Sequence, residues 1–329
     1  MSSHWAGRPV LVTGAGGFIG SHVVDRLVGE GAEVRAFLHY NSRGDVGALG
    51  WESDLSDVDA RFGDLRDEGA LTAAAAGCQA IFHLGALIAI PYSYVAPRDV
   101  VETNVLGTLN VLAAARRVEA ERVVCMSTSE VYGTPEGETI SESDRLNAQS
   151  PYAASKIAAD QLALSFHRSY GLPVGVVRPF NTYGPRQSAR AVIPTILSQG
   201  LGDRELSLGS LHPVRDFLYV EDTVAGVLAF AAWDEAPGSL LHIGTGEGVS
   251  VEEVVRLAGE LLGRELEVRL DAQRVRPDAS EVQRLVCDAR AARDQLGWQP
   301  EVPLREGLER TARWIERNLE RYRPDLYAI

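Results

Sequence analysis

Residues 9–20 of this chain read Pro-Val-Leu-Val-Thr-Gly-Ala-Gly-Gly-Phe-Ile-Gly. The apolar run that ends at Thr13 is typical of a buried parallel strand, and residues 21–28 continue the stretch as an amphipathic helix. Glycines between a strand and a helix let the backbone approach a pyrophosphate, and the helix start supplies N–H donors and positive potential. This order predicts a dinucleotide site; the alternative is a glycine-rich turn without a ligand. The residues expected to form it are Gly14, Gly17, Phe18, Ile19 and Gly20.

The alternation of strands and helices continues through residue 188. Further strands are expected at 33–38, before Phe62, and at 80–86, 122–126 and 174–178. Residues 92–98 are interpreted as a loop, and a long helix is expected to begin at Asn104, whose amide is either a buried brace or a helix cap. Strands that alternate with helices form a parallel sheet with helices on both faces. The predicted fold is therefore α/β, a Rossmann-like doubly wound sheet, with residues 1–188 mainly forming an NAD(P)-binding domain.

The pattern loosens from about Ala189. Residues 189–329 are expected to form mainly a smaller C-terminal substrate-binding lobe, with some exchange of chain between the two parts. Several arginines lie on its loops, and arginines that converge on one cleft suit a diphosphate. For any single arginine the alternative is a surface ion pair. The arginines proposed for the substrate are Arg190, Arg215 and Arg276.

Composition excludes several classes of partner. The chain is 45% hydrophobic and 23% charged, which is ordinary for a soluble globular protein. A net charge of −13 without a basic block argues against nucleic acid, and without an apolar run of membrane-spanning length no membrane partner is expected. Cys78, Cys125 and Cys287 are scattered, so we expect neither a metal site nor disulfides, and a reducing cytoplasm as the location.

The loop after the second strand bears on the choice of cofactor. An NAD site would place an acidic residue near the end of this strand, but the chain has no carboxylate there. His39, Ser42 and Arg43 would tolerate a 2′-phosphate instead. The expected cofactor is therefore NAD or NADP, with NADP favoured. Asp64 is a candidate for the adenine amino group or, equally, a helix N-cap. The other expected cofactor contacts are Leu65, Leu84, Ala86, Tyr152 and Lys156.

A tyrosine and a lysine form the expected reaction centre. Of the 32 basic residues one is a lysine, Lys156, and it follows Tyr152 by four positions. Residues i and i+4 share one face of a helix, so the ammonium and the phenol can meet. A nearby cation lowers the pKa of a phenol, which a general base near neutral pH requires. The alternative is an ordinary pair on a helix surface.

A polar segment follows the strand at 122–126. In doubly wound sheets ligands bind at the carboxyl ends of the strands. Thr128, Ser129 and Glu130 should therefore face the cofactor crevice, close to the expected helix of Tyr152 and Lys156.

Together these residues resemble the extended short-chain dehydrogenase/reductase superfamily acting on nucleotide sugars, over nearly the whole chain. The resemblance implies a tightly bound NAD or NADP that is recycled, a nucleotide-sugar substrate, and substrate contacts at Ser129 and Asn181. It also implies a homodimer through the helices after Asn104 and Tyr152, whose apolar stripes could equally be core. The motifs that carry it lie at residues 13–20, 64–65, 152–156, 179–186 and 215–222.

The reaction depends on Glu130. In this superfamily sugar 4-epimerases carry a small or hydroxyl residue there, whereas 4,6-dehydratases and UDP-glucuronate decarboxylases carry Glu. Residues 91–94 and 187–194 most resemble UDP-N-acetylglucosamine 4,6-dehydratases of legionaminic-type pathways. Ser129 stands where thymidine-diphosphate-glucose dehydratases have an acidic Asp, which argues against that substrate. The predicted activity is a 4,6-dehydratase (a hydro-lyase), with a 4-epimerase, a decarboxylase or a non-catalytic dinucleotide-binding regulator as alternatives.

The resemblance implies a role for each reacting group. Tyr152 takes the O4 proton while Thr128 holds O4, and hydride passes from C4 to the cofactor. Glu130 then removes the C5 proton as water leaves C6, and hydride returns to C6.

Overall fold

The computed structural model describes residues 3–202 and 205–322. Its centre is a seven-stranded sheet in the order β11-β6-β5-β4-β1-β2-β3, and all of its neighbouring strands are parallel. The strands are β1 (Pro9–Thr13), β2 (Glu33–His39), β3 (Val58–Gly63), β4 (Ala80–His83), β5 (Arg122–Met126), β6 (Val174–Pro179) and β11 (Leu240–Ile243). The order reverses between β1 and β4, as in a doubly wound sheet, so the predicted fold class is confirmed.

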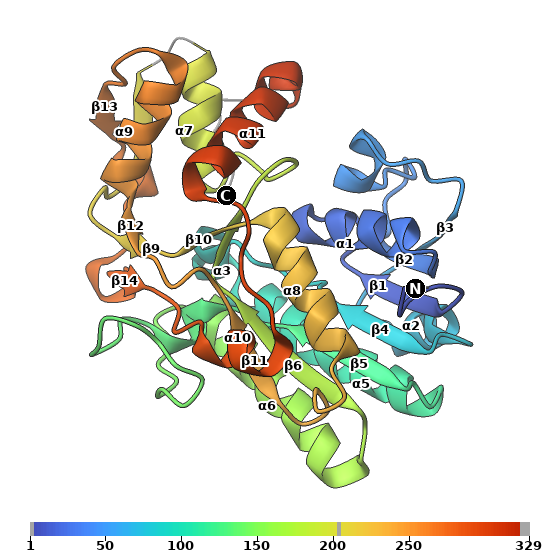
Figure 1. Ribbon diagram of the computed structural model, residues 1–329. Helices are drawn as coiled ribbons and strands as arrows, with labels where there is room; N and C mark the ends of the chain where they lie inside the picture. The colour runs from blue at the N-terminus through green and yellow to red at the C-terminus, as the bar shows by residue number, and fades with distance from the viewer. Residues whose placement is uncertain (1–2, 203–204, 323–329) are drawn as a thin grey trace.

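Helices cover both faces of this sheet (Figure 1). On β1, the side chains of Val10 and Val12 enter one core and that of Leu11 enters the other, because successive residues of a strand point to opposite faces. The first core contains α1 (Phe18–Gly29) and α8 (Val220–Ala232). The second contains α2 (Glu68–Ala75), α5 (Gly107–Arg117) and α6 (Pro151–Tyr170).

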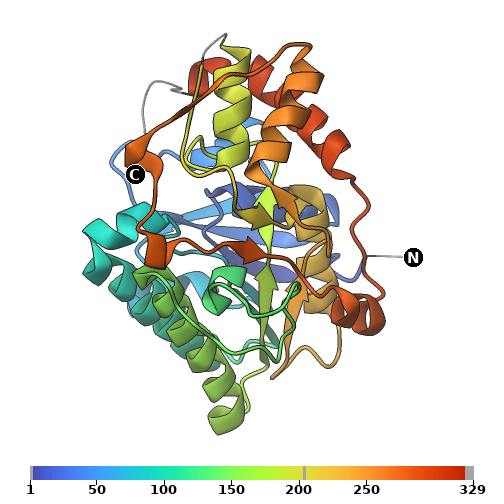
Figure 2. The ribbon, with the colours of Figure 1, turned by 90° about the vertical axis from the view of Figure 1, so that its left-hand side faces the viewer.

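The C-terminal part forms a second cluster of elements. Its long helices are α7 (Val192–Leu201), α9 (Val251–Leu262) and α11 (Leu304–Arg317), which pack on one another at one end of the molecule in both views (Figure 2). Its short strands form three small sheets: β10 (Phe217–Tyr219) with β7 (Asn181–Tyr183), β9 (Val214–Arg215) with β12 (Val249–Ser250) and β14 (Arg284–Leu285), and β8 (Leu206–Leu208) with β13 (Val268–Leu270).

Chain from beyond residue 189 returns to the large sheet, because β11 extends it beside β6 and α8 packs against α1. Residue 188 therefore divides the two parts only for most of their length, and the predicted domain boundary stays a prediction. The remaining helical segments are α10 (Arg290–Leu296), η1 (Gly47–Trp51), η3 (Ser129–Tyr132), η4 (Ala272–Arg274), η5 (Asp278–Ser280) and η6 (Leu319–Arg321).

The segment before α5 differs from the prediction. The expected loop at 92–98 is helical, as α3 (Ile90–Val95) and α4 (Pro97–Val101), and a π-helical turn at Glu102–Leu106 joins it to α5. Each of these two short helices has a proline in its first turn, where no N–H is needed, so proline here begins a helix. The helix expected to begin at Asn104 thus begins earlier in the chain. No described helix is long and apolar enough to cross a membrane.

Candidate active site

The glycine turn joins β1 to α1 as the sequence predicts. Gly14 has a φ of +70°, and a side chain there would place its Cβ 2.7 Å from the backbone of Gly85, so only glycine fits. Gly17 caps α1 and donates its N–H to the carbonyl of Gly14 at 2.9 Å. The first-turn N–H groups, which include those of Phe18, Ile19 and Gly20, have no acceptor inside the helix. A cradle without side chains before a helix start fits a dinucleotide pyrophosphate.

The loop after β2 is held by one asparagine. The Asn41 side chain accepts hydrogen bonds from the N–H groups of Arg43 and Asp45 and donates to the carbonyls of His39 and Asp45. His39, Ser42 and Arg43 are all exposed at this end of the sheet. The structure thus presents two basic side chains at the position that recognises the adenosine ribose in Rossmann folds.

Asp64 does not cap a helix. Its carboxylate accepts from the backbone and the guanidinium of Arg66, which holds the pKa of Asp64 down at about 2. The cap of α2 is Asp67, which accepts from the N–H of Ala70. The N-cap alternative for Asp64 is therefore wrong, and its contact with the adenine stays a prediction.

The wall next to the glycine turn comes from the end of β4. The backbone N–H groups of Leu84 and Gly85 donate to the carbonyl and the hydroxyl of Thr13, which joins β4 to β1. Leu65 packs so closely here that a Cβ on Gly85 would lie 2.9 Å from it. Leu84, Ala86 and Leu65 thus belong to segments that meet at one edge of the sheet.

Asn104 is a structural brace. Its buried amide bonds both backbone groups of Leu87 and donates to the hydroxyl of Ser155 on α6. Of the two alternatives for Asn104, the brace is confirmed.

Tyr152 and Lys156 lie in the first turns of α6, on the face that packs on the end of β5. Ser150 caps this helix by accepting from the N–H of Ala153 at 3.1 Å. The ammonium of Lys156 donates to the carbonyl of Met126 at 2.7 Å, and both side chains are buried. The helix cap and this contact fix the position of both reactive groups relative to the strand end.

The environment of Tyr152 differs from the expectation of a lowered pKa. Burial raises its pKa well above the usual value, Glu130 and Asp160 raise it further, and a hydrogen bond from Thr128 opposes this. The expected lowering is therefore wrong for this side chain, because removal of the phenolate from water is the largest effect. The effect of Thr128 on the pKa of Tyr152 indicates that its hydroxyl lies near the phenol, which suits a shared contact with a sugar hydroxyl.

Glu130 lies within a cluster of opposite charges. Its side chain is 13% exposed, and Arg276 Nη1 lies 3.9 Å from its Oε1 and 3.6 Å from Glu281 Oε1. Arg215, almost fully buried, donates to Glu281 at 3.3 Å. Arg276 Nη1 is buried without a hydrogen-bond partner in the described residues. The structure thus brings two of the three predicted substrate arginines to the predicted catalytic carboxylate.

The other predicted substrate residues are placed differently. The side-chain oxygen of Asn181 is buried and unpartnered within the described part of the chain, which suits a ligand contact. Ser129 is buried beside Glu130. Arg190 instead lies on an exposed turn and donates to the hydroxyl of Ser188, outside the cluster around Glu130.

Sequence reasoning missed a buried polar network behind Lys156. Asp160 and Arg178 form an ion pair at 2.8 Å with both side chains 2% exposed, and Arg178 also donates to Tyr132, whose hydroxyl bonds His242. Asp160 follows Lys156 by four residues, so helical spacing was a usable signal. No sequence pattern pointed to Glu281, because its partners Arg215 and Arg276 lie on other segments of the chain.

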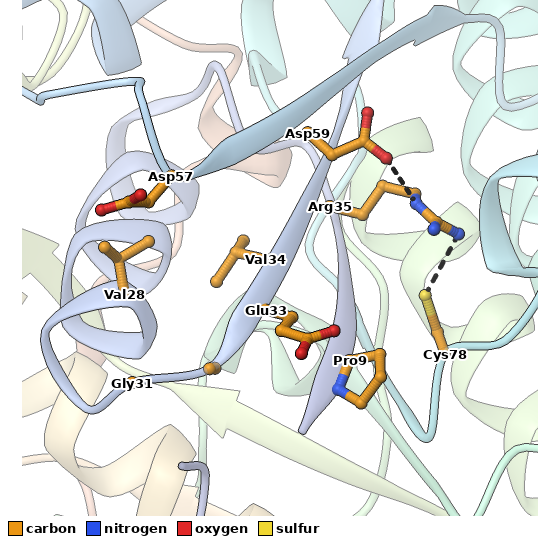
Figure 3. A pocket seen from close by; sticks show the side chains of 10 residues that line it. Pro9, Val28, Gly31, Glu33, Val34, Arg35, Asp57, Asp59 and Cys78 are labelled. Atoms are coloured by element: carbon orange, nitrogen blue, oxygen red, sulfur yellow. Dashed lines mark hydrogen bonds and ion pairs between the residues drawn. The ribbon is translucent and has the colours of Figure 1, made fainter. Parts of the chain in front are cut away.

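A separate hollow lies near the amino ends of β1 and β2, at the opposite edge of the sheet from these residues (Figure 3). Pro9 and Glu33 line it, and Arg35 in its wall donates to Asp59 and Cys78. Because Arg35 is already engaged by these partners, the hollow presents no free cation and plays no part in the site.

Known proteins share this arrangement. The family described as GDP-mannose 4,6 dehydratase matches residues 11–311. The chain belongs to this family. It is thereby an enzyme of the NAD-dependent, nucleotide-sugar-modifying branch of the extended short-chain dehydrogenases/reductases, as the resemblance predicted.

Relatives within the family differ in the reaction they are named for. A dTDP-glucose 4,6-dehydratase of Streptomyces antibioticus is 34% identical over 96% of this chain and 94% of its own length. A putative UDP-glucose 4-epimerase of Methanocaldococcus jannaschii is 30% identical over 94% and 99%. A UDP-glucuronic acid decarboxylase of Xenopus tropicalis is 31% identical over 95% and 73%. These relatives belong to the same family as this chain but are named for different reactions, so the reaction has to be inferred from the residues of the site.

Solved structures of relatives contain cofactor and substrate. MoeE5 in complex with UDP-glucose and NAD superposes with a TM-score of 0.84 at 34% identity, over 94% of this chain and 99% of that one. DesIV, a dTDP-glucose 4,6-dehydratase of Streptomyces venezuelae with NAD bound, has the same TM-score at 32% identity over 96% and 99%. Members of the family thus hold NAD and a nucleotide sugar on this fold.

Proposed function

We propose that this protein is a nucleotide-sugar 4,6-dehydratase that forms a 4-keto-6-deoxy sugar nucleotide, with UDP-N-acetylglucosamine as its substrate. The observation that carries the proposal is the position of Glu130, a carboxylate that acts electrostatically on Tyr152 and is largely shielded from water. Oxidation of a sugar alone needs only the tyrosine. A second shielded base beside it suits an elimination that follows the oxidation.

Each side chain then has one task. Tyr152, as phenolate, accepts the proton of the sugar O4, and Thr128, which already bonds Tyr152, holds that oxygen. NAD(P) held by the glycine turn before α1 would supply reversible hydride transfer between C4 and C6 of the sugar. The 4-keto group acidifies C5–H, and Glu130 takes this proton and passes it to the C6 hydroxyl, which leaves as water. After hydride reaches C6, a proton equivalent to the one taken from O4 returns to C5 and completes the product. The product has lost one water and shows no net change in oxidation state.

The diphosphate of the substrate would be held by Arg215 and Arg276. Both are fixed by Glu281, and the unpartnered Nη1 of Arg276 has bonding capacity left for an anion. A guanidinium binds phosphate oxygens with two parallel donors, so two arginines can grip both phosphates. The free side-chain oxygen of Asn181 would accept from a substrate donor.

A UDP-glucuronate decarboxylase is the second candidate. A decarboxylase needs a cation close to the C6 carboxylate, and Arg276 lies 3.9 Å from Glu130, the group assigned to C5 and C6 chemistry. A 4-epimerase would use Tyr152 and Thr128 but has no task for Glu130.

We infer that the cofactor is NAD or NADP with a preference for NADP. Named relatives hold NAD, but the end of β2 in this chain carries His39 and Arg43 and no carboxylate. We also propose a homodimer, since Val101 and Leu106 expose apolar side chains on the helices beside α6, and a cytoplasmic location, since the three cysteines are free thiols. Light scattering would test the dimer.

The decisive experiment is to incubate the purified protein with UDP-N-acetylglucosamine without added reductant and to follow mass and NMR spectra. Loss of one water with a new 4-keto-6-deoxy spin system supports the dehydratase and its substrate together. Unchanged mass with an inverted C4 would indicate an epimerase and make Glu130 a structural residue. Loss of carbon dioxide from UDP-glucuronate would favour the decarboxylase.

A further inference from the structure

Asp160 lies on the same face of α6 as the two reactive side chains. Tyr152, Lys156 and Asp160 follow one another at intervals of four residues, so they form one row along the helix. Lys156 donates to the carbonyl of Met126, and Asp160 accepts from the hydroxyl of Ser127 at 2.8 Å. Met126, the last residue of β5, and Ser127, which follows it, therefore bond two successive members of this row, Lys156 and Asp160.

The carboxylate of Asp160 is fixed on its other side as well. The same oxygen, Oδ2, accepts from Nε of Arg178 at 3.0 Å and from Nη2 at 2.8 Å. Arg178 is held in turn by Tyr132, and the whole group is buried. A buried carboxylate with these three donors cannot turn away from the helix row.

Among the described residues, burial and the neighbouring groups set the charge of Lys156. Burial lowers the pKa of Lys156, which favours loss of its proton. His83 on β4 has its pKa lowered to about 3, and Cys125 on β5 has its pKa raised to about 12, both by burial, so both are uncharged near neutral pH. The phenol of Tyr152 is also neutral there before it reacts, and the phenolate that accepts the O4 proton forms only in the reacting complex. The carboxylate of Asp160, on the same face of α6, opposes this effect most strongly and raises the pKa of Lys156.

We propose that Asp160 is a positioning residue that keeps Lys156 protonated inside the site and docks the row of Tyr152 onto the end of β5. Asp160 lies on α6, accepts from Ser127 after β5 and pairs with Arg178 on β6, so its carboxylate is held between three segments. The assignment rests on the proposed function only in that Lys156 matters to catalysis. The charge state of Lys156 can be measured without any substrate.

The composition of the chain makes this measurement direct. Because Lys156 is its one lysine, protein labelled with ¹³C at the lysine ε-carbon gives one native lysine signal. Its pH titration reports the pKa of Lys156. In Asp160→Asn we expect this pKa to fall by about one unit or more, a tenfold change in the protonation equilibrium. Ser127→Ala is the matched control, since it removes a hydrogen bond from the same oxygen without changing charge, and it should titrate as wild type.

A second variant keeps the proposal testable if Asp160→Asn does not fold. Asp160→Asn leaves the buried Arg178 unpaired, whereas the double variant Asp160→Asn, Arg178→Gln removes both charges of the pair. The double variant should show the same fall. An unchanged titration in the folded variant, or an equal fall in Ser127→Ala, would overturn the proposal. If the titration shifts but no nucleotide sugar is converted, the proposed function fails and the role of Asp160 stands.

The pH dependence of catalysis gives a second measure of the charge state of Lys156. Activity should disappear at a lower pH in Asp160→Asn than in wild type on the alkaline side, because Lys156 loses its proton earlier. At the acidic end of the working range the variant should regain much of its rate. A loss of rate that is equal at every pH would indicate a role in structure alone.

Discussion

Replacement of Glu130 by Gln isolates the elimination step. The change is nearly isosteric, and the backbone N–H of Glu130 keeps its hydrogen bond to the Thr128 hydroxyl at 3.2 Å. Arg276 keeps Glu281 as its neighbour at 3.6 Å, so the cluster retains a countercharge. The variant should therefore fold and bind as wild type does. The amide cannot accept a proton, and it also lacks the negative charge that raises the pKa of Tyr152, so oxidation at C4 should not be slower than in wild type.

The expected loss follows from the chemistry and the burial. A positioned general base contributes on the order of 10²–10⁴-fold to a rate. At about 1.36 kcal/mol for each factor of ten, this corresponds to about 2.7–5.4 kcal/mol of barrier. The Glu130 side chain is 13% exposed, so bulk water has little access to replace it. We expect overall turnover to fall within that range.

The assay separates the two halves of the reaction. In a single turnover, absorbance of the reduced nicotinamide should rise at the wild-type rate, since oxidation at C4 uses Tyr152, and then persist because elimination is slow. Glu281→Gln is the matched control: it removes a carboxylate beside the same Arg276, and it should change KM more than the rate of elimination. Turnover by Glu130→Gln within threefold of wild type would refute the dehydratase mechanism.

Three further predictions test other parts of the molecule. Tyr152→Phe should abolish cofactor reduction by the substrate while binding persists, and a reduced nicotinamide signal in that variant would contradict its role as base. Arg43→Glu should weaken NADP on the order of tenfold and leave NAD nearly unchanged in calorimetry; an equal loss for both would refute the 2′-phosphate contact. Trp314, buried and stacked on Trp51 with ring centroids 5.7 Å apart, should cost about 3–5 kcal/mol of unfolding free energy in urea when changed to Ala, and a cost below about 1 kcal/mol would contradict its role between α11 and η1.

The sequence by itself determined the parallel sheet and the place of the reaction. An apolar run that ends in glycines and continues as a helix is a local pattern, and such patterns depend on neighbouring residues only. The same holds for Tyr152 and Lys156, whose shared helix face follows from their spacing. Local reasoning failed at 92–98, where the expected loop is two short helices that each have a proline in the first turn.

Only the tertiary structure decided the chemical environment of those groups. Arg215 and Arg276 reach Glu130 from distant segments, and no spacing rule joins them. The pKa of Tyr152 rises because α6 is packed against the end of β5 and water is removed, which depends on atoms from several elements. Burial also makes His83 and Cys125 neutral and leaves Asp160 as the charge facing Lys156. A sequence pattern specifies which groups are present, whereas their protonation depends on the solvent and charges that the folded chain places around them.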